Sequence, residues 1–540
     1  MNPMKRNLLF ILLLLCKINS FAQQDAWVYL SDKENVAEAI SNPITILTQK
    51  AIDRKSAHSV AIDERDVPVN ESYISEIKLQ TGITVMAKSK WFNAVHVRGT
   101  QANIEALSGL QFVSHIDFAD KGLNTTRSSA YQNKFELENV STDFNYGNAL
   151  NQIEMFNGDE LHIADYTGMG MTIAVLDAGF PNVHSIDGFR RLRDSGNILG
   201  TYDFVERDED VYTNTTSSHG TLVLSDMAGY IEDQFVGTAP DASYYLFITE
   251  DAPNENPVEE SYWVEAAERA DSLGVNVINT SLGYTTFDNS NYNYSPSDMD
   301  GNTAFISRGA NIAFEKGMLL VNSAGNSGNN SWGIVGAPAD AAGVLSVGAV
   351  DANGQYASFS SRGDNSQSVH KPDVVAQGQA SFVITQNNTL TTANGTSFSS
   401  PILAGGVACL WQALPTLTNA QIMQLIRESA SQHDNPDYFS GYGIPNLQVA
   451  LANGLSLVDV EIEDLDLRIY PNPVSDEIQL NVPNDEIVKI YIFDVLGKLV
   501  VDSYFDNTKS TVDILSLSKG IYIAKLQSGN QSRTLKLIKE

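Results

Sequence analysis

The chain has 540 residues, which at about 150 residues per domain predicts several folding units rather than one. Apolar residues make up 43% and charged residues 18%, a composition typical of globular protein with a sizeable core. Acidic residues outnumber basic ones by 65 to 34, which gives a net charge of −31 and argues against nucleic acid as a partner. The acidity indicates either cation binding or a solubilising surface on an exported protein, and we favour the solubilising surface.

Residues 1–22 have the pattern of a signal peptide. Lys5 and Arg6 precede the apolar run Leu8–Leu15, and small residues stand near its end, in Ser20-Phe21-Ala22. The apolar run is too short for a membrane anchor, which needs about 20 residues. No later stretch reaches roughly 18 uninterrupted apolar residues, so we expect no stable membrane span.

The two cysteines fit the same interpretation. Lipid attachment at Cys16 is disfavoured because Leu15 stands where a small residue is expected. Cleavage after Ala22 would leave Cys409 as the only cysteine, so no intramolecular disulfide could form and stability must come from packing, alone or together with a bound metal.

Residues 23–123 predict a small α+β domain, because short strand-like runs alternate with helical patterns. The strand-like runs are 27–30, 83–86 and 94–97, and the helical patterns cover 72–79 and 101–106. Residues 124–150 are polar and lack periodicity, which predicts an exposed connector that is easily cut.

Residues 151–455 contain continuous apolar runs separated by longer helical stretches. This pattern predicts a parallel sheet covered by helices on both faces. The runs are 172–176, 244–248, 275–279, 318–321 and 344–347. Most of the net charge lies here, since this segment has 35 acidic and 10 basic residues.

The end of the chain predicts a third unit. An acidic linker is expected at 456–467, and 468–540 show apolar residues at every second position, as in 478–482, 488–492 and 521–526. This period predicts a small all-β sandwich.

Three segments of the central domain carry chemistry. Asp177 ends a buried strand, where ligands of open α/β sheets gather, although an Asp in an ordinary turn is the simpler interpretation of this motif alone. His219 opens a helical pattern that ends at Gly229, and a single His there is more often structural.

The third segment is more specific. Asn394-Gly395-Thr396-Ser397 leads into an apolar helix with Pro401 in its first turn, which puts the Ser397 hydroxyl at a helix N-terminus. Free N–H groups there favour developing negative charge. The alternative is that Ser397 only caps the helix.

In the order Asp177, His219, Ser397, these segments resemble the catalytic motifs of the subtilisin-like serine peptidases, the subtilase family. The resemblance extends over 151–455 and includes the landmarks 236–240, 277–283 and 323–326. It implies a subtilisin-like fold.

The resemblance also implies roles. Ser397 would be the nucleophile, His219 the general base and then acid, and Asp177 the carboxylate that orients the imidazole. Asn326 would donate its amide to the oxyanion. The walls of the primary specificity pocket would be Ser281, Leu282 and Gly283 on one side and Ala324 and Gly325 on the other.

Some positions depart from the family pattern. Ala178 stands where the family usually has Ser or Thr, which removes a hydroxyl that could support Asp177. Phe398 and Ser399 stand where it often has Met and Ala. We expect altered tuning or packing rather than inactivity.

The flanking domains have resemblances of their own. Residues 23–123 resemble the family's propeptides, with Leu110-Gln111-Phe112-Val113 as part of the matching stretch, which implies assisted folding and a blocked cleft until removal. The alternative is a permanent accessory domain.

Residues 468–540 resemble the type A sorting domain of type IX secretion substrates. The matching segments are 469–473, 493–497, 518–522 and 534–539. The resemblance implies contact with the type IX secretion machinery, passage across an inner and an outer membrane, and residence at the cell surface or in the medium. The alternative is an ordinary carbohydrate- or protein-binding sandwich.

Taken together, the sequence predicts a secreted, self-maturing serine endopeptidase that acts on polypeptides through an acyl-enzyme. Its chemistry requires no cofactor. The family resemblance leaves room for structural calcium, for which Asp208-Glu209-Asp210 or the 250–260 region could serve without a regular ligand spacing, so the metal sites stay open. The rivals are an inactive surface adhesin or binding protein on the same fold and a dedicated processing peptidase with one partner. Substrate preference, maturation site, oligomeric state and physiological role stay open.

Overall fold

A computed structural model describes residues 23–123, 144–213, 215, 217–458, 469–480, 487–493, 499–506, 508–528 and 531–539. The predicted signal peptide and most of the predicted connector and acidic linker lie outside the described residues, so the domain boundaries stay predictions. Within the described residues, every helix is too short or too polar to cross a membrane.

The N-terminal domain is an antiparallel sheet with helices on one face, in the strand order β2-β3-β1-β4. Its main elements are β1 (Gln23–Leu30), α4 (Glu71–Lys78), β2 (Ile83–Ser89), β3 (Ala94–Thr100), α5 (Gln101–Ala106) and β4 (Val113–Phe118). This β-α-β-β-α-β order is ferredoxin-like. The predicted α+β character is confirmed.

The two faces of β1 explain how this domain is buried on both sides. Because side chains alternate along a strand, Val28 points into the domain's own core with Ile74 and Ile77 of α4. Trp27 and Tyr29 point the other way and join a core cluster of the central domain.

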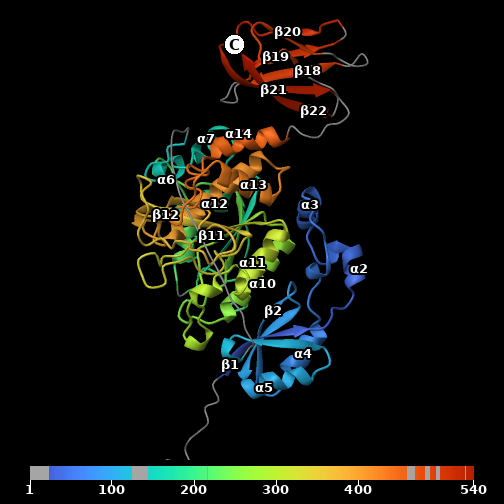
Figure 1. The fold of residues 1–540 in the computed structure, drawn as a ribbon, viewed down its shortest axis with the longest axis vertical. Helices are drawn as coiled ribbons and strands as arrows, with labels where there is room; N and C mark the ends of the chain where they lie inside the picture. Colours follow the sequence, from blue (N-terminus) through green and yellow to red (C-terminus); the bar gives the residue numbers. More distant parts are fainter. Residues whose placement is uncertain are drawn as a thin grey trace, which may run out of the picture.

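An insertion interrupts the ferredoxin-like pattern. Between β1 and α4, residues 31–70 contain α2 (Val36–Ser41) and α3 (Gln49–Ala57), which the sequence patterns did not predict. In Figure 1, α2 and α3 extend away from the four-stranded sheet and along the central domain.

The central domain is built on a seven-stranded parallel sheet in the order β13-β12-β11-β10-β5-β9-β6. Its strands are β5 (Thr172–Asp177), β6 (Ile198–Asp203), β9 (Ser243–Ile248), β10 (Val277–Thr280), β11 (Leu319–Ser323), β12 (Val344–Val350) and β13 (Val374–Gln377). Inner strands such as β5 and β12 are buried along their whole length, as their continuous apolar runs predicted.

Helices cover both faces of this sheet, so the predicted fold class is confirmed (Figure 1). One face packs against α9 (His219–Ala228) and α12 (Thr396–Ala413), and the other against α10 (Val258–Leu273) and α11 (Phe305–Glu315). The remaining α-helices and strands are α6 (Leu150–Glu154), α7 (Gly158–Ile163), α8 (Arg190–Asp194), β7 (Tyr230–Ile231), β8 (Phe235–Val236), β14 (Ser381–Ile384), β15 (Leu390–Ala393), α13 (Asn419–Glu428) and α14 (Leu447–Val458).

The C-terminal domain consists of two antiparallel sheets, β16-β17-β20 and β19-β18-β21-β22, with one shared core. Its strands are β16 (Ile469–Tyr470), β17 (Glu477–Leu480), β18 (Val488–Phe493), β19 (Leu499–Phe505), β20 (Thr511–Asp513), β21 (Gly520–Ser528) and β22 (Gln531–Lys539). In β18 the alternate residues Val488, Ile490 and Ile492 are fully buried, as the period-two pattern predicted.

Candidate active site

Three of the predicted site segments meet at the carboxyl edge of the parallel sheet. Asp177 is the last residue of β5, Ser281 follows β10, and Asn326 lies three residues after β11. Because β5, β10 and β11 are neighbours in the sheet, these chain ends lie side by side.

Asp177 and His219 are hydrogen-bonded. His219 Nδ1 lies 2.8 Å from Asp177 Oδ1, and the carboxylate is fully buried. His219 is the first residue of α9, and Gly220 permits its close approach, since a Cβ there would lie 2.6 Å from Gly179 O and 3.1 Å from the Asp177 Cβ. Position 220 therefore needs glycine to bring α9 against the end of β5.

The environment of His219 changes its basicity. Burial lowers the pKa of the imidazole, but the charge and hydrogen bond of Asp177 outweigh burial and raise the pKa above its ordinary value of 6.5. A histidine with a raised pKa and a carboxylate on Nδ1 leaves Nε2 to exchange protons with a substrate or nucleophile.

Ser397 lies in the first turn of α12. Gly395 precedes the helix with φ 153° and ψ 148°, a conformation that glycine adopts readily. The Ser397 hydroxyl donates to Ser281 O at 3.3 Å, and its backbone carbonyl accepts from Ser281 Oγ at 2.9 Å. The ring of Phe398, the next residue, lies 6.2 Å from the His219 ring between centroids. These contacts bring α12 to the edge where Asp177 and His219 lie.

Asn326 is held by the turn that precedes Ser397. Its Oδ1 accepts from Thr396 N at 2.9 Å and from Thr396 Oγ1 at 3.2 Å. The Thr396 backbone N–H can only donate, so the amide atom that it contacts is the oxygen, and Nδ2 is the donor end of the amide. An amide held in this way is suited to binding developing negative charge.

A cavity of about 150 Å³ lies between the loops that follow β10 and β11 and the start of α12. All five predicted wall residues line it together with Asn326 and Ser397. Thr285, Ile334, Gly336 and Ser361 also line it and were not found from the sequence. They lie on loops without a motif, and only the pairing of those loops brings them to the cavity. The lining carries no formally charged side chain.

Comparison with known proteins decides the family. The subtilase family (Peptidase_S8) matches residues 168–443, which is more than half of the chain and includes every residue of the site described above. The chain belongs to the subtilase family. It is a subtilisin-like serine endopeptidase.

Curated subtilases are similar over the same region. Subtilisin E from Bacillus subtilis (strain 168) is 31% identical over 300 residues, which are 55% of this chain and 70% of that protein. Subtilisin DY from Bacillus licheniformis is 29% identical over 300 residues, 97% of its length. Among solved structures, MycP1 with the N-terminal propeptide removed matches 58% of this chain at 24% identity and a TM-score of 0.42.

The flanking domains match families as well. The Peptidase S8 propeptide domain of Bacteroidota matches residues 25–136 of this subtilase, and the secretion system C-terminal sorting domain matches 468–540. The predicted propeptide and sorting domain are therefore confirmed, and the sorting domain indicates export to the cell surface or the medium.

Two departures of this subtilase from the family pattern have visible effects. Asp177 Oδ2 is buried without a hydrogen-bond partner among the described residues, as expected where Ala178 lacks a hydroxyl. Ser399 is accommodated, because its hydroxyl donates to Thr396 O at 3.0 Å inside α12.

A cluster of carboxylates lies close to the subtilase site. Glu250, Glu255 and Glu259 each place one oxygen within 4.8 Å of the others, in the region that the sequence analysis named for calcium. Carboxylate oxygens suit Ca²⁺, although Glu259 already accepts from Asp251 N at 2.8 Å and Asn256 N at 2.7 Å. Asp208-Glu209-Asp210 forms no such group within the described residues. A calcium site in this chain stays a prediction.

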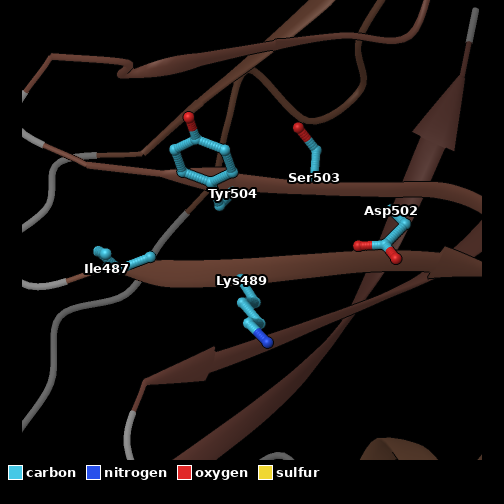
Figure 2. Close-up of a pocket in the computed structure, with 5 residues that line it drawn as sticks. All are labelled: Ile487, Lys489, Asp502, Ser503 and Tyr504. Atoms are coloured by element: carbon cyan, nitrogen blue, oxygen red, sulfur yellow. The ribbon is translucent and has the colours of Figure 1, made fainter.

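A second hollow, of about 400 Å³, lies on the sorting domain. Figure 2 shows its lining, which comes from β18, β19 and the residue before β18: Ile487, Lys489, Asp502, Ser503 and Tyr504. No predicted site residue lines it, so we assign no part of the peptidase site to it.

Proposed function

We propose that Asp177, His219 and Ser397 form the catalytic triad of this serine endopeptidase, which hydrolyses peptide bonds through an acyl-enzyme. The observation that carries the proposal is the 2.8 Å contact between His219 Nδ1 and buried Asp177, at the sheet edge where Ser397 lies in the first turn of α12.

The proposed reaction begins with a change in the Ser397 side chain. Its hydroxyl turns from Ser281 O to His219 Nε2, since catalytic hydrogen bonds are often long or misdirected before substrate binds. Ser397 Oγ then attacks the carbonyl carbon while His219 takes the proton, and Asp177 holds the imidazolium.

The oxyanion forms next to Asn326. Its Nδ2 and the Ser397 backbone N–H at the start of α12 donate to the oxygen that gains charge. His219 returns its proton to the leaving amine, and a water molecule, activated in the same way, releases the acyl group from Ser397.

The cavity next to Ser397 would take the side chain that precedes the cleaved bond. Because its lining is uncharged, we expect an uncharged side chain there. The substrates would be polypeptides, with the peptide backbone bound by strand addition along 281–283.

Maturation would consist of a cut in the predicted connector, 124–150, made by the enzyme itself. The sorting domain would then engage the type IX secretion machinery. Structural calcium is part of the same proposal, but no catalytic step depends on it.

Three forms of the purified chain test the proposal: unmodified, Ser397→Ala and Asn326→Leu. We expect the unmodified chain to lose its N-terminal domain and digest an unfolded protein. Ser397→Ala should do neither, and Asn326→Leu should lose about 100- to 1,000-fold in kcat. Intact mass over time and turnover of casein measure both properties.

The result that would overturn the proposal is equal behaviour of the unmodified and Ser397→Ala chains at several pH values and with calcium added. The better explanation would then be an inactive adhesin or binding protein that has the peptidase fold.

A further inference from the structure

Two surfaces of the N-terminal domain pack against helices α10 and α11 of the peptidase domain. The first is the outer face of its sheet, which covers α10 and α11. Trp27 stacks on Phe305 with 4.7 Å between ring centroids and donates from Nε1 to Ser261 Oγ at 2.9 Å. Glu268 of α10 accepts from Trp91 N at 2.9 Å and Lys90 N at 2.9 Å.

The second contact is made by the insertion, residues 31–70, and it is built from charged side chains. Arg54 Nη2 lies 2.5 Å from Asp271 Oδ1, and Lys55 Nζ lies 2.9 Å from the same oxygen. Arg54 and Lys55 belong to α3 in the insertion, whereas Asp271 belongs to α10. The Asp271 side chain is fully buried, and those of Arg54 and Lys55 are 3% and 1% exposed.

A third cation, from the peptidase side, completes this charged cluster. Lys316, which directly follows α11, lies 2.7 Å from Asp66 Oδ2 of the insertion, and both side chains are buried. Lys55 also lies 3.2 Å from Asp66 Oδ1. Arg54 Nη1 donates to Lys316 O at 2.9 Å, so the insertion holds the C-terminal ends of both α10 and α11.

The insertion touches the amino edge of the parallel sheet. Lys50 Nζ donates to Thr172 Oγ1, the first residue of β5. Gly274 packs against Lys50 and Ala51, and Gly317 packs against Val60; these glycines stand shortly before β10 and β11. The candidate active site lies at the other ends of the same strands. Strands rise about 3.3 Å per residue, so roughly 15–20 Å separates the two edges. The insertion therefore cannot act by covering Ser397.

We propose that residues 31–70 are a clamp that keeps the N-terminal domain bound to the peptidase domain after the connector is cut. The contacts at the amino edge of the sheet would then determine how long the cut N-terminal domain stays bound and the enzyme stays latent. The ion pairs of Asp271 with Arg54 and Lys55, and of Lys316 with Asp66, are buried and cross the interface. Their charges must therefore separate before the domains do, and loss of one partner leaves a buried charge unpaired. The proposal rests on the proposed function only in assuming that the connector is cut.

The test uses the full chain with Ser397→Ala and a recognition site for an unrelated, sequence-specific protease inserted between residues 124 and 143. The protein is immobilised through a C-terminal tag and cut, and departure of the N-terminal domain is followed by biolayer interferometry. Because the added protease makes the cut, this measurement does not depend on activity of the chain.

The main variant is Arg54→Ala with Lys55→Ala, and the matched control is Glu315→Gln. Glu315 also crosses the interface, 2.6 Å from Arg65, but its side chain is 58% exposed. We expect the double variant to release the domain about tenfold faster or more, and the control to change the rate less than about threefold, because exposed ion pairs contribute little.

A second variant, Arg54→Lys, keeps the charge but cannot contact Asp271 and Lys316 O together, so the test does not depend on the double variant folding. It should accelerate release by an intermediate amount. Equal release rates in the double variant and the Glu315→Gln control would overturn the clamp, and so would immediate release from the unmodified insertion.

A second arm restores Ser397. Arg54 and Lys55 leave with the N-terminal domain, so the double variant and the unmodified chain yield the same mature enzyme. We expect the double variant to show a shorter lag before substrate turnover than the unmodified chain, and both to reach the same final kcat/KM. An unchanged lag would count against the clamp, whereas a chain without any turnover would contradict the proposed function and leave the release measurement intact.

Discussion

Asp177 has two carboxylate oxygens in different situations. Oδ1 accepts from His219 Nδ1 and from Ala178 N at 2.7 Å, whereas Oδ2 is buried without a partner among the described residues. A buried acceptor without a partner costs about 1–3 kcal/mol. Ala178, which follows Asp177 in the sequence, therefore affects the hydrogen bonding of the carboxylate that raises the pKa of His219.

The raised pKa of His219 predicts the pH dependence of the reaction. The imidazole must be neutral to accept the Ser397 proton, and Asp177 stabilises its charged form, so activity is lost as pH falls through the raised pKa. We expect kcat/KM to rise with pH with a midpoint above 6.5, the ordinary pKa of histidine. In Ser397→Ala, the His219 titration followed by NMR should move to lower pH when Asp177→Asn is added. A kinetic midpoint at or below 6.5 would contradict this account.

Glu250 makes a separate prediction about stability. Burial, followed by the charge of Glu255, raises its pKa from 4.5 to about 8, while the hydrogen bond from Tyr284 Oη at 2.8 Å opposes the shift. The folded state thus holds a proton that the unfolded state loses above 4.5, so this contribution to stability is lost as pH rises to about 8.

Glu250→Gln removes this dependence. At pH 8 the substitution should raise the free energy of unfolding by on the order of 2 kcal/mol, with little effect at pH 4. Urea unfolding of the Ser397→Ala chain at both pH values, with a chelator present to remove calcium, measures the difference. Glu232→Gln, at an exposed position, is the control and should change neither value. A pH-independent effect of Glu250→Gln would show that another interaction is responsible.

At the scale of elements, α9 must approach β5 closely enough for His219 to reach Asp177. A Cβ at position 220 would lie 2.8 Å from the Phe180 ring and 2.6 Å from Gly179 O, so α9 would have to move. We expect Gly220→Ala to lower kcat by about 100-fold, because a 1 Å misplacement of a catalytic group can cost that much. KM for a small ester substrate should change far less. A kcat within about threefold of the unmodified enzyme would mean that the loops absorb the change.

The sequence predicted the inner part of this architecture well. The five apolar runs correspond to β5, β9, β10, β11 and β12, with ends shifted by a few residues. It missed β6 and β13, for different reasons. β6 is an edge strand with partly exposed residues, and in β13 only Val374, Val375 and Ala376 are apolar, so neither forms a long apolar run.

The insertion could not be predicted in the same way. Arg54, Lys55 and Asp66 are charged, which favours a surface position in any sequence pattern. They are buried because Asp271 and Lys316, more than 200 residues further along the chain, supply their partners. The site residues followed from motif and resemblance, whereas loop residues such as Ile334 and Ser361 reach the cavity only through tertiary structure.

At the scale of the molecule, the sorting domain has a core of its own. Ile478, Ile490 and Leu526 are fully or almost fully buried among residues of the same domain. A chain that lacks residues 468–540 should therefore keep the kcat/KM and melting temperature of the peptidase domain and lose export from the producing cell. Casein turnover by the purified protein and its distribution between cells and medium measure the two effects. Loss of activity on deletion would mean that the sorting domain supports the peptidase fold.

The contacts of the insertion, residues 31–70, lie at the amino edge of the central sheet, whereas the reacting groups lie at the carboxyl edge. Substitutions within 31–70 would therefore change how long the enzyme stays latent, but they would not change the kcat/KM of the mature enzyme. Selection, in nature or in the laboratory, can adjust these two traits independently, which is useful for a protease that must reach its destination before it starts to cut.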